Sequence, residues 1–213
     1  MKLYSFFASS ASFRVRIALN LKALDYDTVP IQLRKDGGQN LTPEYVNINP
    51  QGLVPTLIDE GSNIPQSIAI IEYLEEKYPD IPVLPEKPED RAIVRAMALA
   101  IACDVHPLNN SGVLRYLRQE MQQSEKAISR WYEHWIQRRF NGLEQMVDNY
   151  GGTYCYGDTI TLADICLIPQ IYNAKKFNCD INDYTKLLKI YDTLILHPAF
   201  EAARPESQAD YEK

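Results

Sequence analysis

Cysteine and histidine are scarce in this sequence, and neither occurs at the short spacings that bind metal ions. The three histidines are scattered, and no two of the four cysteines form a CxxC pair. Because zinc and iron–sulfur sites need such spacings, no metal is expected. We expect reduced and mostly buried thiols, as in a cytoplasmic protein; they are Cys103, Cys155, Cys166 and Cys179.

The sequence also lacks a basic excess and a long apolar run. Its 22 lysines and arginines are outnumbered by 28 acidic residues, which gives a formal net charge of −6. Since no basic stripe stands out, neither nucleic acid nor a membrane surface is expected as a partner. No stretch approaches the roughly 18 apolar residues of a membrane span, and residues 1–7 lack the apolar core of a signal peptide. The 213 residues suffice for one large domain or two small ones.

The chain up to about residue 78 alternates strand-like and helix-like runs. Pro30 favours an edge strand or a strand start, because proline cannot donate a ladder hydrogen bond. The turn signal Glu60-Gly-Ser62 predicts a hairpin. The predicted order is therefore β-α-β, a linking segment, then β-β-α. The predicted strands are residues 2–7, 28–33, 55–59 and 63–65, and the predicted helices are residues 12–23 and 67–78.

The rest of the chain is helical in pattern and follows a proline-rich stretch. Four prolines within residues 79–88 predict a stiff linker, because proline fixes φ and ends helices. His106-Pro107 and Gly112 should bend the first long helix, and Thr161 with Asp164 resembles a capping box. The predicted helical stretches are residues 90–122, 128–150 and 165–176. The predicted domains are residues 1–80, of α/β type, and residues 89–213, all helical.

Three serines crowd the point where the first strand passes into the first helix. They are Ser9, Ser10 and Ser12 in the stretch ASSASFRVR. They either cap the helix or present hydroxyl groups to a bound ligand, and the pattern alone favours capping. Tyr4 offers a competing hydroxyl, but it lies inside the predicted strand and is interpreted as a core or sheet residue.

Two further short motifs stand at the ends of predicted elements. Val54-Pro55 precedes a strand, and a cis bond there would leave the Val54 backbone free to pair with an extended peptide, although only about 5–6% of such bonds are cis. Gln66 and Ser67 open a helix, where free amides and the helix dipole favour a carboxylate. An ordinary N-cap is the alternative for Ser67.

Taken together, these residues resemble the glutathione transferase family. The stretch SSASFRVRIALNLK is similar to the Ser-Ser-Cys-Ser-x-Arg-Val-Arg-Ile-Ala-Leu signature of zeta-class members, the maleylacetoacetate isomerases. The similarity continues through NINPQGLVPTL, QSIAIIEYLEEKYP and TYCYGDTITLADICLIPQIYNAKKF, from about residue 3 to 200. The resemblance implies an α/β plus all-α fold, in which an N-terminal thioredoxin-like βαβ-ββα domain is followed by a C-terminal helical bundle.

The same resemblance implies a function. It is glutathione-dependent cis–trans isomerisation of maleylacetoacetate, or of a close relative such as maleylpyruvate, in tyrosine, phenylalanine or aromatic catabolism. Glutathione is the implied cofactor, a small dicarboxylic-type acid the substrate, and a homodimer the implied assembly. Two alternatives stay open: a general glutathione transferase or dehalogenase acting on small electrophilic acids, and a non-catalytic binding module of the same fold.

Site residues also follow from the resemblance. It implies that Ser9 activates the thiol of glutathione, with Ser10 beside it. The implied glutathione-binding residues are Ser9, Ser10, Ala11, Ser12, Arg14, Asn40, Val54, Gln66 and Ser67. The implied substrate-binding residues are His106, Asn110, Ser111, Gly112 and Lys176, although residues 109–112 could equally form a simple helix kink.

The sequence departs from the family pattern at three positions that bear on the acid substrate. Ala8 stands where the family commonly has arginine, Ala11 where it has cysteine, and Lys176 where it has an arginine thought to hold a carboxylate. Lysine keeps the positive charge but lacks the planar two-point fork of arginine. We hypothesise that a nearby arginine compensates; the three considered are Arg14, Arg115 and Arg118.

Overall fold

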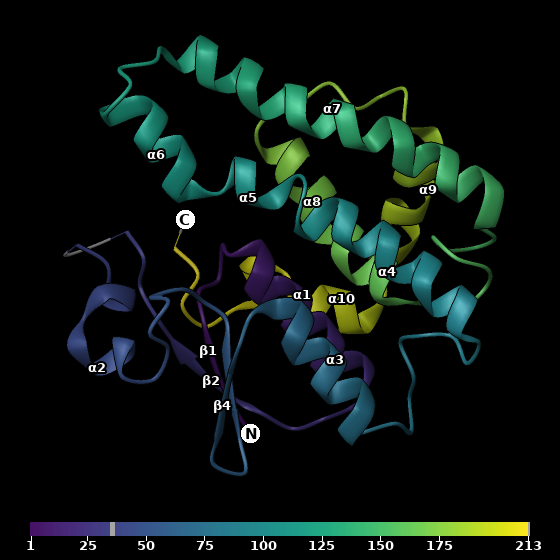
Figure 1. Ribbon diagram of the computed structural model, residues 1–213, viewed down its shortest axis with the longest axis horizontal. Coiled ribbons are helices and arrows are strands. Elements are labelled where there is room, and N and C mark those ends of the chain that lie inside the picture. The colour runs from purple at the N-terminus through teal and green to yellow at the C-terminus, as the bar shows by residue number, and fades with distance from the viewer. Residues whose placement is uncertain (35–36, 213) are drawn as a thin grey trace. The chain divides into compact units, whose positions relative to one another are not determined.

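The computed structural model describes residues 1–34 and 37–212, and it divides into two compact units. Unit 1 comprises Met1–Val83 together with the residues from Leu196 onward, and unit 2 comprises Leu84–Ile195. Figure 1 labels most of the helices and strands of the two units. The residues from Leu196, which the sequence analysis assigns to the helical domain, thus group with unit 1. The reason lies in long-range contacts, because the Arg16 guanidinium donates to the carbonyl of Ala203.

Unit 1 is built on a four-stranded sheet of order β2-β1-β3-β4. β1 runs parallel to β2 and antiparallel to β3, and β3 runs antiparallel to β4. The predicted β-α-β then β-β-α order is confirmed, and β2, which ends at Pro30, is an edge strand as the proline indicates. The elements are β1 Lys2–Ser5, α1 Ser10–Leu21, β2 Asp27–Pro30, the 3₁₀ helix η1 Gln39–Leu41, α2 Pro43–Val46, β3 Thr56–Asp59, β4 Ser62–Pro65, α3 Ser67–Lys77, α10 Pro198–Ala203 and the 3₁₀ helix η2 Pro205–Ser207.

The first strand and helix have shifted boundaries. The strand ends at Ser5 rather than residue 7, because the chain turns and the Ser9 amide donates to the Phe6 carbonyl at 3.0 Å. The helix begins at Ser10 rather than residue 12, since Ser9 is its N-cap. The short helix α2 was not predicted, although Thr42 followed by proline is a typical helix start.

The register of the sheet brings three strand ends together at one end of the sheet. Tyr4 pairs with Thr56, which in turn pairs with Pro65 on β4. The carboxyl end of β1, the start of β3 and the end of β4 therefore meet at the same edge. These ends lead to or come from Ser9, Val54 and Gln66. The fold of unit 1 thus gathers the predicted glutathione-binding motifs.

Unit 2 contains helices and, within the described residues, no named strand. The predicted first long helix is broken, as expected, but the breaks lie at residues 103–105 and at Asn110. The capping box is confirmed: the Asp164 carboxylate accepts from both the amide and the hydroxyl of Thr161, at 2.8 and 2.9 Å. The helices are α4 Pro88–Ala102, α5 His106–Asn109, α6 Ser111–Gln119, α7 Glu125–Tyr150, α8 Leu162–Lys176 and α9 Thr185–Leu194.

One stretch of unit 2 is apolar enough to resemble a membrane span, which the sequence analysis did not expect. By length and composition Pro88–Gln119 passes such a test, with a window of mean hydropathy 1.2. The core helices of soluble proteins pass the same test, so a single such stretch is weak evidence. Here it is divided among three helices, and α4 buries Val94, Met97 and Ile101 in unit 2.

Candidate functional site

Ser9 is both a helix cap and a source of a hydroxyl group. Its backbone is extended, and its Oγ accepts a hydrogen bond from the Ser12 amide at 3.2 Å, the usual N-cap geometry. Since Oγ is the acceptor, the O–H remains available as a donor, and no acceptor for it is found among residues 1–34 and 37–212. The two interpretations of this serine are therefore compatible.

The residues that follow Ser9 lie deeper in unit 1. Ser10 and Ser12 are both buried. The Ser12 amide donates to the Ser9 Oγ, and the Ser12 hydroxyl lies in the interior of unit 1. Ala11 is half-buried. Arg14 is also buried, and its Nη1 lies 3.4 Å from the Ser67 hydroxyl. Arg14 therefore links α1 to the start of α3, and this burial argues against its proposed role as a replacement cation for a bound acid.

Gln66 holds an unusual backbone conformation at the start of α3. Its φ is 73° and its ψ 119°, a region that side chains other than glycine avoid. Such a conformation costs about 1–3 kcal/mol and is concentrated at ligand-binding sites. The side chain is exposed, and its Nε2 donates to Gln51 Oε1 at 2.7 Å. Beside it, Ser67 is buried.

The Val54-Pro55 bond is cis, which the sequence could not decide. Val54 is half-buried, and no hydrogen bond of its amide or carbonyl to another residue of the described ranges is found. An extended peptide could therefore pair with this backbone, as the sequence analysis anticipates.

Two residues that the sequence analysis missed hold the loop before Val54. The hydroxyl of Tyr45 donates to the Leu53 carbonyl at 2.7 Å, and the side-chain amide of Asn49 donates to the same carbonyl at 2.8 Å. Asn49 also donates to the Thr56 hydroxyl at 3.0 Å. Burial raises the pKa of Tyr45, which keeps its hydroxyl protonated as a donor. The turn sequence Asn-Pro-Gln-Gly, whose first residue is Asn49, could have indicated from sequence that Asn49 holds this loop.

Asn40 contacts this loop directly, whereas Tyr4 contacts Tyr45, which holds it. The side-chain amide of Asn40 donates to the Gly52 carbonyl at 2.6 Å, so its NH₂ group already supports the loop. Gly52 precedes Val54 by two residues, so Asn40 contacts the loop that leads to Val54, and its contact with glutathione stays a prediction. Tyr4 lies in β1 and its ring packs 5.8 Å from the ring of Tyr45, which fits its interpretation as a sheet residue.

In unit 2, the Asn110–Gly112 segment is a capped helix break. The Asn110 Oδ1 accepts from the amides of Gly112 and Val113 at 2.8 and 3.1 Å, and its NH₂ donates to the Pro107 carbonyl. The kink alternative for these residues thus has direct support, because the Asn110 side chain is used locally. Ser111 and Gly112 are exposed, and His106, half-buried, begins α5.

Tyr132 of α7 connects the two predicted substrate segments of unit 2. The side-chain amide of Asn109 donates to the Tyr132 carbonyl at 3.0 Å, and the Phe177 ring stacks on the Tyr132 ring at 4.3 Å. The end of α5 and the end of α8, where Lys176 is exposed, therefore both contact one residue. Of the hypothesised replacement cations, Arg118 is held by Glu125 through two hydrogen bonds, and Arg115 is exposed on α6.

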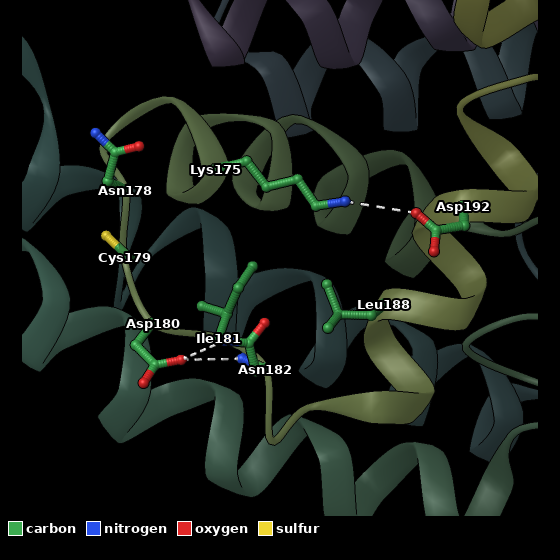
Figure 2. A pocket seen from close by; sticks show the side chains of 8 residues that line it. All are labelled: Lys175, Asn178, Cys179, Asp180, Ile181, Asn182, Leu188 and Asp192. Atoms are coloured by element: carbon green, nitrogen blue, oxygen red, sulfur yellow. Dashed lines mark hydrogen bonds and ion pairs between the residues drawn. The ribbon is translucent and has the colours of Figure 1, made fainter.

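A hollow of about 510 Å³ lies at the end of α8 but contains none of the predicted site residues. Figure 2 shows Lys175 reaching toward Asp192, and Cys179 is among the residues that line the hollow. Burial, reinforced by the charge of Glu133, raises the pKa of Cys179 to about 11. Burial likewise raises the pKa of Cys155. Neither thiol therefore supplies a thiolate near neutral pH.

The four cysteines differ in burial, although the sequence predicts that most of them are buried. Cys155 and Cys166 are buried, whereas Cys103 is exposed and Cys179 half-buried, so burial holds for only part of the set. All four thiols are free. Within residues 1–34 and 37–212, no group of three or more metal-ligating side chains could hold an ion.

Comparison with known proteins identifies both halves of the chain. Residues 3–87 match the glutathione S-transferase N-terminal domain, and residues 109–202 match the glutathione S-transferase C-terminal domain. A probable maleylacetoacetate isomerase of Vibrio cholerae is 44% identical over 208 residues, which cover 98% of this chain and 97% of that protein.

Two solved structures share the fold over their whole length. A holo maleylpyruvate isomerase, described as a bacterial zeta-class glutathione S-transferase, is 40% identical and has a TM-score of 0.95, with 100% of both chains covered. A maleylacetoacetate isomerase from Methylobacterium extorquens AM1, with bound malonate and glutathione, is 34% identical and has a TM-score of 0.94, again with 100% of both chains covered.

Proposed function

This chain belongs to the glutathione S-transferase family, and we propose that it is a zeta-class cis–trans isomerase with glutathione as its cofactor. Its substrate is maleylacetoacetate or a close relative such as maleylpyruvate, which it converts to the fumaryl isomer. The observation that carries this proposal is the meeting of the Ser9 hydroxyl, the Val54 backbone and the Gln66–Ser67 helix start at one sheet edge of unit 1.

The groups at this edge suit the three parts of glutathione. The start of α3 offers amides and a positive dipole end to the γ-glutamyl carboxylate, beside the exposed Gln66 side chain. The Val54 backbone can pair with the cysteinyl residue, and Asn40, which donates to the Gly52 carbonyl, is proposed to contact the glycyl end. These positions leave the thiol near Ser9. Ser10, Ala11, Ser12 and Arg14 then support the site from within α1.

One hydroxyl group at a helix start can supply the free energy needed to lower the thiol pKa of glutathione. A thiol has a pKa of about 8.5, so only a few per cent is ionised at pH 7. Lowering that pKa by about two units needs about 2.7 kcal/mol of preference for the anion. A hydrogen bond to a charged partner contributes about 1.5–3 kcal/mol, and a helix N-terminus adds about 0.3–1 kcal/mol. Ser9 at the start of α1 supplies both.

The chemistry divides between the cofactor and the protein. When bound, glutathione supplies a thiolate that adds reversibly to the cis double bond, so that the resulting single bond can rotate. Ser9 donates its O–H to the sulfur and holds it in place. His106, Asn110, Ser111, Gly112 and Lys176 of unit 2 are proposed to orient the acid, with Lys176 as a point charge for a carboxylate.

The remaining properties follow from family membership. The protein is soluble, and we infer that it acts in the cytoplasm, in aromatic catabolism, as a homodimer without nucleic-acid or membrane partners. The relative that contains malonate together with glutathione supports a small dicarboxylic acid as the second ligand. The domain boundaries at residues 1–80 and 89–213 remain predictions.

The test is turnover with a small amount of glutathione. Purified protein is incubated with an excess of maleylacetoacetate, or of maleylpyruvate, over glutathione. An isomerase converts many equivalents of acid per glutathione and leaves the free thiol concentration unchanged. Consumption of one thiol per product would instead indicate a conjugating transferase or dehalogenase. Binding of glutathione without turnover of any such acid would indicate a non-catalytic module.

A further inference from the structure

The end of the chain returns to the connection that carries Ser9. After α10, residues 204–212, here called the tail, continue through η2 and a turn closed by the Tyr211 amide on the Gln208 carbonyl at 3.0 Å. Gln208 anchors this path, because its side-chain amide donates to the carbonyls of Ala202 and Arg204, at 2.9 Å each. Figure 1 shows the yellow C-terminal segment beside the purple β1–α1 connection of unit 1.

The tail contacts this connection at Phe7. The Phe7 amide donates to Asp210 Oδ2 at 3.1 Å, across more than two hundred residues of sequence. The Tyr211 ring meets the Phe7 ring edge-on, with 5.5 Å between centroids and 89° between planes. One polar and one aromatic contact thus fix the same residue from the tail side.

Arg16 holds the same residue from the interior. Its side chain is fully buried, and its Nη2 donates to the Phe7 carbonyl at 3.1 Å while its Nη1 lies 3.4 Å from the Phe6 carbonyl. Burial lowers the pKa of Arg16 to about 10, and the nearby charge of Asp210 opposes this effect. The guanidinium therefore remains charged at neutral pH. Both polar backbone groups of Phe7 are held by side chains of opposite charge.

Ser9 lies two residues after Phe7, which Asp210 and Arg16 hold from opposite sides. Its amide donates to the Phe6 carbonyl at 3.0 Å, so a rotation of the Phe6–Phe7 peptides would move the Ser9 backbone with them. A displacement of about 1 Å at a reacting group can cost a factor of about 100 in rate. The position of the Ser9 hydroxyl thus depends on contacts that involve the end of the chain.

The geometry points to Asp210 as a positioning residue for Ser9. Asp210 accepts from the Phe7 amide while Arg16 donates to the Phe7 carbonyl, and the two contacts together fix the connection that leads to Ser9. This inference rests on the proposed function of Ser9. Asp210 does not act through its charge, because a carboxylate near the site would oppose thiolate formation. Among residues 1–34 and 37–212, Arg16 and Arg34 also lie beside Phe7, and the Arg34 guanidinium lies 6.0 Å from the Phe7 ring centre.

A pair of substitutions separates position from charge. Asp210→Asn removes the charge but keeps an oxygen that can accept from the Phe7 amide, whereas Asp210→Ala removes both. Glu212→Ala is the matched control, since it removes a tail carboxylate that accepts from the half-buried Gln32 side chain. The primary measurement is the ultraviolet absorbance of the thiolate of bound glutathione as a function of pH, which needs no second substrate.

We expect Asp210→Ala to raise the thiol pKa by about half a unit to one unit and to lower kcat about 5- to 20-fold, with the KM for the acid changed less than twofold. Asp210→Asn should keep kcat near that of the unaltered protein without raising the thiol pKa, and Glu212→Ala should leave both values unchanged. A lower thiol pKa in both Asp210 variants would show that only charge matters and would overturn the proposal. So would unchanged values in a folded Asp210→Ala.

The two proposals fail in different ways. If bound glutathione titrates as described but no acid is isomerised, the positioning role of Asp210 stands and the reaction assignment fails. If Ser9→Ala leaves the thiol pKa unchanged, the assigned role of Ser9 fails, and the inference about Asp210 fails with it. Circular dichroism of each variant separates these outcomes from loss of folding.

Discussion

Ser9 combines a structural and a chemical role in one oxygen atom. As an N-cap it stabilises α1, and as an O–H donor it is proposed to stabilise a thiolate. A simple alanine substitution removes both, so loss of activity alone would not separate them. Ser124 provides the comparison, because it caps α7 by the same contact: its Oγ accepts from the Ala127 amide at 3.2 Å, as Ser9 does from Ser12.

We predict that Ser9→Ala and Ser124→Ala lower the free energy of unfolding by a similar amount, about 1 kcal/mol each. Only Ser9→Ala should lower kcat/KM, by about 10- to 100-fold, since it alone loses a hydrogen bond to the thiolate. Denaturant unfolding and steady-state kinetics measure the two effects. Equal losses of activity in both variants would mean that Ser9 acts only as a cap.

At the level of single residues, local chemistry was predictable and distant contacts were not. Ser9 and Ser67 stand at helix starts, which short motifs reveal. The roles of Arg16 and Asp210 depend on a hydrogen-bonded path between residues far apart in sequence, and no local pattern encodes such a partner. The same holds for Asn49, whose importance appears only when the loop before Val54 has folded around it.

At the level of elements, the strands and helices of unit 1 were largely predictable from their apolar runs and from the turn and cap residues between them. Boundaries were not, since they depend on single contacts such as the Ser9 cap. The start of α3 shows a second limit. The sequence places Gln66 there, but nothing in it reveals a backbone with φ of 73°. That conformation costs the fold stability, and we propose that it is kept because the position serves a ligand.

Gln66→Gly tests this cost. Glycine adopts positive φ readily, so we expect the free energy of unfolding to rise by about 0.5–1 kcal/mol while the Kd for glutathione increases about 10-fold. Ala23→Gly is the control, because Ala23 is exposed, has φ of 52° and carries only a methyl group. It should gain similar stability without a change in Kd. If Gln66→Gly binds glutathione normally, its side chain has no part in holding the cofactor.

At the level of the whole molecule, the division into two units was predicted, but the anchoring of the linker was not. The boundary between Val83 and Leu84 falls inside the proline-rich stretch. The start of this linker is fixed to unit 1 by a buried ion pair: Lys22 lies 2.8 Å from Glu75 and donates to the carbonyls of Tyr78 and Ile81. No local pattern predicts this pair, because Lys22 and Glu75 lie 53 residues apart in the sequence.

The ion pair predicts how the two units respond to its loss. Removing one partner of a buried pair typically costs about 3–5 kcal/mol, because the other charge stays buried and unpaired. Glu75 would still accept from the Val83 amide, but it would lose the Lys22 ammonium group. Lys22→Met should therefore destabilise unit 1 selectively. Lys175→Met is the control, since the pair of Lys175 with Asp192 is exposed and is expected to contribute about 0–1 kcal/mol.

The sequence provides a natural reporter for this experiment. Both tryptophans, Trp131 and Trp135, lie in α7 of unit 2, so their fluorescence follows unit 2, whereas far-ultraviolet circular dichroism follows both units. For Lys22→Met we expect a circular dichroism transition that begins at lower denaturant and separates from a fluorescence transition that stays in place. Coincident shifts of both signals would contradict this, because they would show that the two units unfold as one cooperative block.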